Sequence, residues 1–200
     1  MKLYYAPDTC SLSSHIVLRE LGLSFELVKV DIRAKRTADG RDFLDINPKG
    51  YVAALELDDG NVLTEGPAIV QYLADLHPAR GLAPAAGTLQ RARLQEWLNF
   101  ITSELHAGLG PLFNPSLPED ARVYFREKLS RRLDYLQGIL AGQDHLMGDA
   151  FSVADAYLFT VLGWCEYVGI DIARWPALPA YVARVGARPA VQDALRAEAA

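Results

Sequence analysis

Cys10 is the residue of this chain whose position most clearly suggests chemistry. Residues 1–6 favour a strand, residues 7–9 carry a turn signal, and apolar residues recur at helical spacing over 11–22. A cysteine at such a junction lies near unpaired backbone N–H groups and the positive end of the helix dipole, and both favour the reactive thiolate. Free cysteines are also often buried and inert. Placement alone therefore leaves both interpretations open.

A second group of residues combines charges of both signs. Glu65 and Gly66 stand between a strand pattern and a helix pattern, where exposed N–H groups bind carboxylates and an acidic side chain pairs with an ammonium group. Arg33, Lys35 and Arg36 form a short basic cluster earlier in the chain. Together these residues predict an amino-acid-like ligand that carries both charges.

A third group is a polar stripe on a predicted helix. Asn99, Ser103 and His106 are spaced by four and then three residues, so they fall within an arc of roughly 60° on an α-helix. Glu104 lies elsewhere on the same helix. Amphipathic helices usually expose such stripes to solvent, so a solvated face is the alternative to a binding role.

Composition narrows the class of protein. Of the 200 residues, 50% are hydrophobic and the formal net charge is −5, so disorder and nucleic-acid binding are not expected. The chain shows no membrane-span pattern and no signal-peptide pattern. Cys10 and Cys165 are too far apart in sequence to indicate a disulfide framework, and the four histidines show no metal-ligand spacing. We expect a cytoplasmic enzyme or binding protein without a metal, a membrane partner or a nucleic-acid partner.

Strand and helix patterns divide the chain into two parts. Strands are expected at 1–6, 25–30, 52–57 and 61–63, and helices at 11–22, 43–46 and 65–76. Beyond a segment rich in Pro and Gly at 77–87, only helices are expected, at 88–107, 119–140, 152–168, 178–185 and from 189 onward. The prediction is an α/β domain at 1–79 with one mixed sheet, a linker at 80–87, and an all-α domain at 88–200.

The sequence SVAD at 152–155 is typical of a capping box. Ser152 would be the N-cap and Asp155 the third helical residue, with Phe151 placed to pack against the first turn. We interpret this motif as structural. Loss of the Asp155 side chain is expected to lower stability by about 1 kcal/mol.

In chain order, these segments resemble the glutathione S-transferases of the bacterial beta class. The resemblance covers essentially the whole chain and rests on the segments MKLYY (1–5), TCSLS (9–13), NPKGYV (47–52), LTEG (63–66), IVQYLAD (69–75) and SVADAY (152–157). It implies a thioredoxin-like N-terminal domain, an all-α C-terminal domain, a homodimer, and glutathione bound between the domains as a co-substrate rather than a cofactor.

The resemblance also implies a role for particular residues. Cys10 would lie beside the glutathione sulfur, and His106 would approach the same region from the second domain. The other implied roles are Lys35 at the glycine carboxylate, the Val52 backbone at the cysteinyl unit, Glu65 and Gly66 at the γ-glutamyl end, and Asn99, Ser103 and Glu104 at glutathione from the second domain or across the dimer interface.

Two positions depart from the family pattern. Ala53 stands where thioredoxin-like sites normally have a cis-proline, so the sequence leaves open whether the Val52–Ala53 peptide is cis or trans. Ala107 stands where beta-class enzymes often have a lysine, so His106 would supply more of any local positive field.

The leading prediction is transfer of glutathione to electrophilic, mostly apolar substrates, with Phe113 and Trp164 as candidate aromatic residues of the substrate pocket. The alternative is glutathione-dependent thiol–disulfide exchange or reductive dehalogenation with Cys10 as the nucleophile, because Ser13 occupies the last position of a C-x-x-C-like site. A non-catalytic stress or binding protein on the same scaffold is a third interpretation.

Overall fold

The computed structural model describes residues 1–199, which form two compact units. Unit 1 is Met1–Ala83 together with the C-terminal segment that starts at Ala187, and unit 2 is Pro84–Gly186. Among the described residues, no helix is long and apolar enough to cross a membrane. No group of His, Cys, Asp and Glu in that part of the chain is arranged to hold a metal ion.

Unit 1 contains a mixed sheet whose strand order, within residues 1–199, is β3-β2-β1-β4-β5. The strands are β1 (Lys2–Tyr5), β2 (Glu26–Asp31), β3 (Arg36–Thr37), β4 (Ala54–Glu56) and β5 (Val62–Thr64). β1 is parallel to β2 and antiparallel to β4, so Leu3 pairs with Leu27 on one side and with Leu55 on the other. Leu3 and Leu55 are fully buried. The single mixed sheet expected from the sequence is confirmed, and the short strand β3 was not predicted.

Helices α1 and α3 pack on this sheet, and the helices of unit 1 begin at turns that carry candidate ligand residues. They are α1 (Ser11–Glu20), α2 (Phe43–Ile46), α3 (Gly66–Leu76), a 3-10 turn at Pro78–Arg80, and α9 (Pro189–Ala199). Helix α3 packs against α1. The contact is made by apolar faces because Ile16 of α1 and Ile69 and Leu73 of α3 are fully buried.

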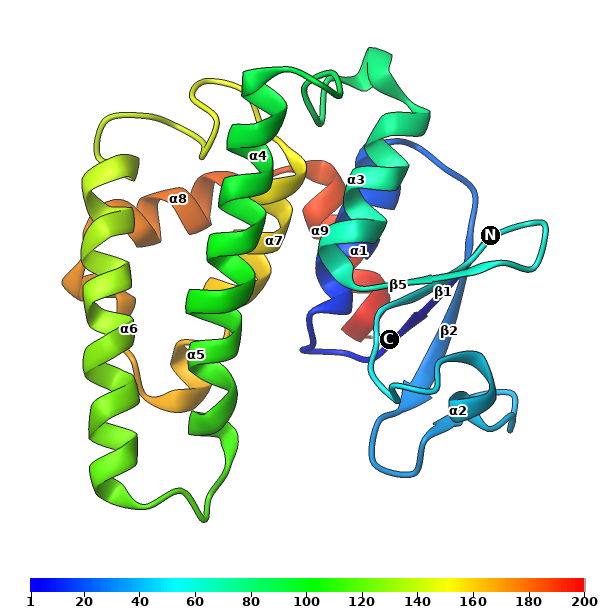
Figure 1. Cartoon of the computed structure of the whole chain (residues 1–200), viewed down its shortest axis with the longest axis horizontal. Helices are drawn as coiled ribbons and strands as arrows, with labels where there is room; N and C mark the ends of the chain where they lie inside the picture. Colours follow the sequence, from blue (N-terminus) through cyan, green and yellow to red (C-terminus); the bar gives the residue numbers. More distant parts are fainter. Residues whose placement is uncertain (200) are drawn as a thin grey trace. The chain divides into compact units, whose positions relative to one another are not determined.

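The C-terminal helix α9 packs on α1, within unit 1 (Figure 1). His15 of α1 is fully buried, and its Nδ1 lies 2.8 Å from a carboxylate oxygen of Glu198. At the other end of α1, the Glu20 carboxylate accepts from the Arg188 guanidinium at 2.6 and 3.0 Å. The sequence predicted an all-α domain that includes residues 187–199. In the structure these residues belong to unit 1, because α9 packs on α1.

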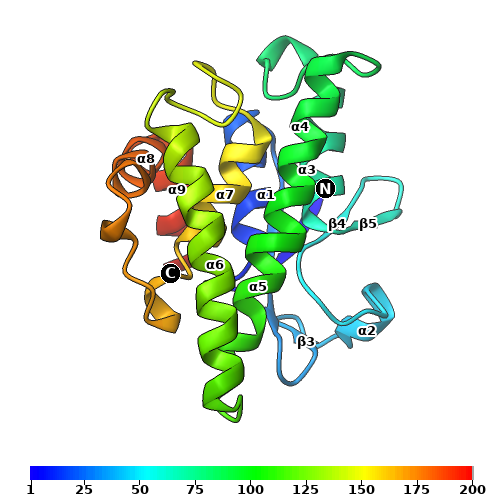
Figure 2. The ribbon, with the colours of Figure 1, turned by 60° about the vertical axis from the view of Figure 1, so that its left-hand side comes forward.

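Unit 2 consists of helices joined by turns and loops, with no strand of a sheet among the described residues. Its helices are α4 (Leu89–Phe100), a π-helical segment (Ile101–His106), α5 (Ala107–Leu109), α6 (Glu119–Leu140), α7 (Val153–Leu162) and α8 (Ala177–Gly186), with 3-10 turns at Gly110–Phe113, Glu166–Val168 and Ile172–Arg174. Helix α6 runs alongside α5 and the π-helical segment (Figure 2). The predicted all-α character is confirmed.

The predicted capping box is present at the start of α7. Its Asp155 side chain also accepts hydrogen bonds from outside the helix. Asp155 is fully buried and accepts hydrogen bonds from the Ser152 N–H at 2.8 Å, the Leu146 N–H at 2.8 Å and the Tyr181 hydroxyl at 3.0 Å. This carboxylate therefore fixes α7, a preceding loop and α8 to one another.

Candidate functional site

Cys10 immediately precedes α1, as predicted, and is partly exposed. Its thiol donates to the Val52 carbonyl oxygen at 3.2 Å. The candidate thiol is thus hydrogen-bonded to the residue whose backbone is expected to bind the cysteinyl part of the ligand.

Burial raises the pKa of the Cys10 thiol to about 11 from an ordinary 9.0. The N–H groups of Cys10 and Ala53 act in the opposite direction, and the nearby negative charge of Glu65 adds to the increase. The backbone N–H groups thus favour the thiolate, as expected at this junction, but loss of hydration outweighs them.

The peptide between Val52 and Ala53 is cis. Both residues are buried. The conformation that the sequence left open is thus the one found at the corresponding cis-proline of the family pattern.

Lys35 has a positive φ of 54°, which a non-glycine residue rarely adopts. Its ammonium group donates to the Gly50 carbonyl at 2.7 Å and lies 5.4 Å from the centre of the Tyr51 ring. These contacts hold the cation beside the segment that leads to Val52, and its role at a carboxylate stays a prediction.

Glu65 also has a positive φ, 72°, and directly precedes Gly66, the first residue of α3. Strained backbone conformations of this kind gather at ligand sites. The Glu65 carboxylate pairs with the Lys49 ammonium at 2.7 Å, and both side chains are more than half exposed. Lys49 was not among the predicted site residues, although it belongs to the NPKGYV segment that marked the family.

The structure therefore brings together the candidate residues of unit 1. A Cβ added to Gly66 would lie 3.7 Å from the Ser13 hydroxyl, and this hydroxyl donates to the Cys10 carbonyl at 2.7 Å. The N-terminus of α3 is thus adjacent to the first turn of α1. A small ligand here meets a thiol, backbone N–H and C=O groups, a helix N-terminus and charges of both signs.

The candidate residues of unit 2 lie around a π-helical segment, Ile101–His106, that interrupts the predicted helix. A π-helical turn has an i to i+5 hydrogen bond and often marks a functional position. The α-helical spacing that placed Asn99, Ser103 and His106 on one stripe therefore does not continue through this segment. Asn99 and Ser103 are exposed and donate to carbonyls of their own helix, whereas His106 is half-buried.

Two aromatic residues fix the His106 ring. Its Nδ1 lies 2.7 Å from the hydroxyl oxygen of Tyr157 on α7, and its ring packs edge to face on Trp164 with centroids 4.7 Å apart. Trp164 in turn contacts Phe113, with centroids 6.2 Å apart. Tyr157 could not be selected from the sequence, because its contact with His106 depends on how α7 packs against the π-helical segment.

Glu104 is held by two cations of α6. Its carboxylate lies 2.6 Å from Arg132 Nε and 3.5 Å from Lys128 Nζ. The Arg132 hydrogen bond is the main reason that the pKa of Glu104 lies below its ordinary value. The predicted contacts of Asn99, Ser103 and Glu104 with glutathione, and the approach of His106 to its sulfur, stay predictions.

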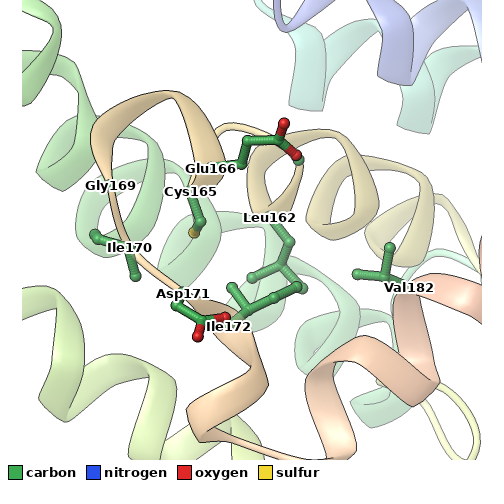
Figure 3. A pocket seen from close by; sticks show the side chains of 9 residues that line it. Leu162, Cys165, Glu166, Gly169, Ile170, Asp171, Ile172 and Val182 are labelled. Carbon is green, nitrogen blue, oxygen red and sulfur yellow. The ribbon is translucent and has the colours of Figure 1, made fainter.

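A hollow of about 480 Å³ lies elsewhere in unit 2 (Figure 3). Leu162, Ile172 and Val182 form part of its apolar lining, and Glu166 and Asp171 carry carboxylates at opposite ends in this view. Neither Phe113 nor Trp164 lines it. Cys165 at its wall is buried, and loss of hydration raises the pKa of its thiol to about 12.

Both parts of the chain are similar to known proteins. Family models of the glutathione S-transferase N-terminal and C-terminal domains match residues 1–75 and 100–189. The chain is 48% identical to glutathione S-transferase GstA of Escherichia coli O157:H7 over 198 residues, which is 99% of this chain and 98% of GstA.

Solved structures agree with this match. A sphingomonad glutathione S-transferase complexed with glutathione superposes with a TM-score of 0.96 at 52% identity, covering 100% of this chain and 99% of the other. The beta-class glutathione S-transferase of Sphingomonas chungbukensis gives a TM-score of 0.95 at 46% identity, covering 99% and 98%.

The chain belongs to the glutathione S-transferase family. Its class within the family is the bacterial beta class, as the sequence motifs implied, and its thioredoxin-like and all-α parts are those of the family fold. It is a transferase that uses glutathione as a substrate.

Proposed function

We propose that this transferase conjugates reduced glutathione to small, mostly apolar electrophiles, and that glutathione binds to the residues gathered around Cys10. The observation that carries the proposal is the cluster in unit 1, where the Cys10 thiol lies 3.2 Å from the Val52 carbonyl oxygen and Glu65 is close enough to influence the Cys10 pKa. These groups match a peptide that has a thiol between two charged ends.

Each part of glutathione has a partner of suitable chemistry in unit 1. Lys35 pairs with the glycine carboxylate, and the Val52 backbone groups pair with the cysteinyl unit. Glu65 binds the γ-glutamyl ammonium, while the N–H of Gly66 and the adjacent end of α3 bind its carboxylate. The positive φ of Lys35 and of Glu65 supports this assignment, because both strained residues then serve the ligand.

Cys10 acts as a hydrogen-bond donor to the glutathione sulfur rather than as the attacking group. A thiol whose pKa is about 11 keeps its proton near neutral pH. The Cys10 thiol can then donate its proton in a hydrogen bond to the thiolate of glutathione. Thiol–disulfide exchange or dehalogenation through Cys10 would instead need Cys10 itself to be the thiolate. This difference favours conjugation over the alternative chemistry.

Unit 2 contributes a second donor and the surface for the electrophile. His106 stabilises the thiolate of glutathione, and Asn99, Ser103 and Glu104 make polar contacts to the tripeptide. Trp164 and the half-exposed Phe113, which pack edge to face, offer aromatic surface to an apolar electrophile.

We further propose that the protein acts as a homodimer in the cytoplasm. Trp97, Phe100 and Tyr135 form an aromatic cluster on α4 and α6, with Tyr135 51% exposed. Arg93, Glu96, Glu104 and Arg132 surround a hollow at the same place. An aromatic patch with a charged rim is typical of a protein interface.

A Cys10→Ala variant tests the role of the thiol. Conjugation of an aryl halide such as 1-chloro-2,4-dinitrobenzene is expected to fall by less than about tenfold, because a weak donor is lost. Reduction of a glutathione mixed disulfide, if the wild type shows it, is expected to disappear. Cys165→Ala is the matched control for loss of a buried thiol. Loss of both activities in Cys10→Ala would make Cys10 the attacking group and contradict the proposal.

A further inference from the structure

The contact between Tyr157 and His106 has features that ordinary packing does not require. The Tyr157 side chain is 2% exposed and comes from the middle of α7. Buried phenol hydroxyls need a hydrogen-bond partner, and most side-chain partners in proteins are backbone groups or water. Here the partner is a ring nitrogen of the residue proposed to act on glutathione, at 2.7 Å.

The position of the Tyr157 hydroxyl is itself fixed. Helix α7 is anchored at its start by the buried Asp155, which also binds α8 through the Tyr181 hydroxyl. Thr102, within the π-helical segment, places its Oγ1 3.5 Å from the Tyr157 oxygen and donates its own proton to the Leu98 carbonyl at 2.8 Å. The hydroxyl therefore reaches His106 from a rigid helix.

The direction of this hydrogen bond decides the tautomer of His106. The distance of 2.7 Å suits either the phenol O–H or the ring N–H as the donor. With Tyr157 as the donor to Nδ1, a neutral imidazole ring carries its proton on Nε2. The edge-to-face contact with Trp164 restricts rotation of the same ring.

We propose that Tyr157 is a positioning residue for the transferase reaction: its hydroxyl orients His106 and keeps the neutral ring protonated on Nε2, so that Nε2–H is the donor to the glutathione sulfur. This inference rests on the proposed role of His106. Tyr157 does not touch the reacting atoms and acts only through the His106 ring.

Kinetics of a Tyr157→Phe variant test the proposal, with Tyr181→Phe as a control. Tyr181 is also a buried tyrosine of unit 2 whose hydroxyl binds Asp155 instead of His106. We expect Tyr157→Phe to lower kcat for conjugation about tenfold with little change in the KM for glutathione, since one oriented donor is lost. Tyr181→Phe is expected to lower the unfolding midpoint and leave kcat within about twofold, because hydroxyls of this kind contribute to stability.

Introducing Tyr157→Phe into a His106→Ala variant distinguishes an error in the role of Tyr157 from an error in the role of His106. If Tyr157 acts through His106, Tyr157→Phe has no further effect on kcat in that background. An equal loss with and without His106 would show a merely structural role for Tyr157. Unchanged conjugation in His106→Ala alone would instead overturn the proposed role of His106.

Nitrogen NMR of protein labelled with 15N-histidine gives a readout that does not depend on activity. At alkaline pH, where imidazole rings are neutral, we expect the wild-type His106 ring to show a protonated Nε2 and an unprotonated Nδ1. Tyr157→Phe should produce a mixture of the two tautomers, and Tyr181→Phe should not. A wild-type ring protonated on Nδ1 would contradict the proposal.

Discussion

The groups proposed to bind glutathione in unit 1 are placed mainly by the main chain, whereas those in unit 2 are placed by other side chains. Lys35 and Glu65 owe their positions to a positive φ, and Val52 offers backbone groups next to a cis peptide. His106 instead depends on Tyr157 and Trp164, and Glu104 depends on Arg132. Substitution of neighbouring side chains should therefore disturb the ligand groups of unit 1 less than those of unit 2, where each ligand group is held by another side chain.

The strongest test of this contrast is Asp155→Ala in unit 2. The change removes the acceptor of buried donors on Ser152, Leu146 and Tyr181. We expect the free energy of unfolding to fall by about 3 kcal/mol, more than the 1 kcal/mol expected from the capping motif alone, because several donors lose their partner. Urea denaturation followed by tryptophan fluorescence measures the change, since Trp97, Trp164 and Trp175 all lie in unit 2.

Ser152→Ala is the matched control for Asp155→Ala. It removes only the capping hydroxyl and is expected to cost about 1 kcal/mol. Equal losses in the two variants would show that the contacts to Leu146 and Tyr181 contribute nothing, and the proposed dependence of unit 2 on this carboxylate would then be wrong.

The pH dependence of Cys10 alkylation tests how unit 1 controls its thiol. With a pKa of about 11 instead of 9.0, the thiolate fraction near neutral pH is about 100-fold lower than that of an ordinary cysteine. The rate with iodoacetamide, measured in a Cys165→Ala background, should rise about tenfold per pH unit from pH 7 to pH 10, because the thiolate is the reactive form. A plateau below pH 9 would contradict the assignment, and free N-acetylcysteine provides the reference profile.

The smallest expected effect concerns a side chain of unit 1. Glu65→Gln keeps the backbone at this position but removes the charge proposed to bind an ammonium group. The dissociation constant for glutathione, measured by calorimetry, is expected to rise about tenfold, the low end for a charge-assisted hydrogen bond, because Glu65 is largely exposed. Glu26→Gln, an exposed change on β2, is the control and should leave it unchanged. An unchanged constant in Glu65→Gln would remove this residue from the site.

Elements with strong local signals could be predicted from the sequence. The helix expected at 119–140 has those bounds in α6. Cys10, Glu65 and Gly66 also lie where the sequence placed them, at the starts of α1 and α3.

The remaining features depend on contacts between segments distant in sequence. The π-helical segment at Ile101–His106 has the residue pattern of an ordinary α-helix, so the local sequence does not predict it. The contacts of Tyr157 with His106 and of Arg132 with Glu104 arise from helix packing. The pKa of Cys10 depends on burial, which turn and helix signals do not report. Helix α9 was assigned to the helical domain for a similar reason, since its partner is α1 at the opposite end of the chain.

The pairing of α9 with α1 has a consequence for synthesis of the protein. His15 and Glu20 can form these ion pairs only after Glu198 and Arg188, which lie 183 and 168 residues further along the chain, have been synthesised. The thioredoxin-like unit therefore cannot finish folding as it emerges, although domains often fold in order from the N-terminus during translation. Unit 2 is synthesised before α9, the helix that completes the packing around α1 in unit 1.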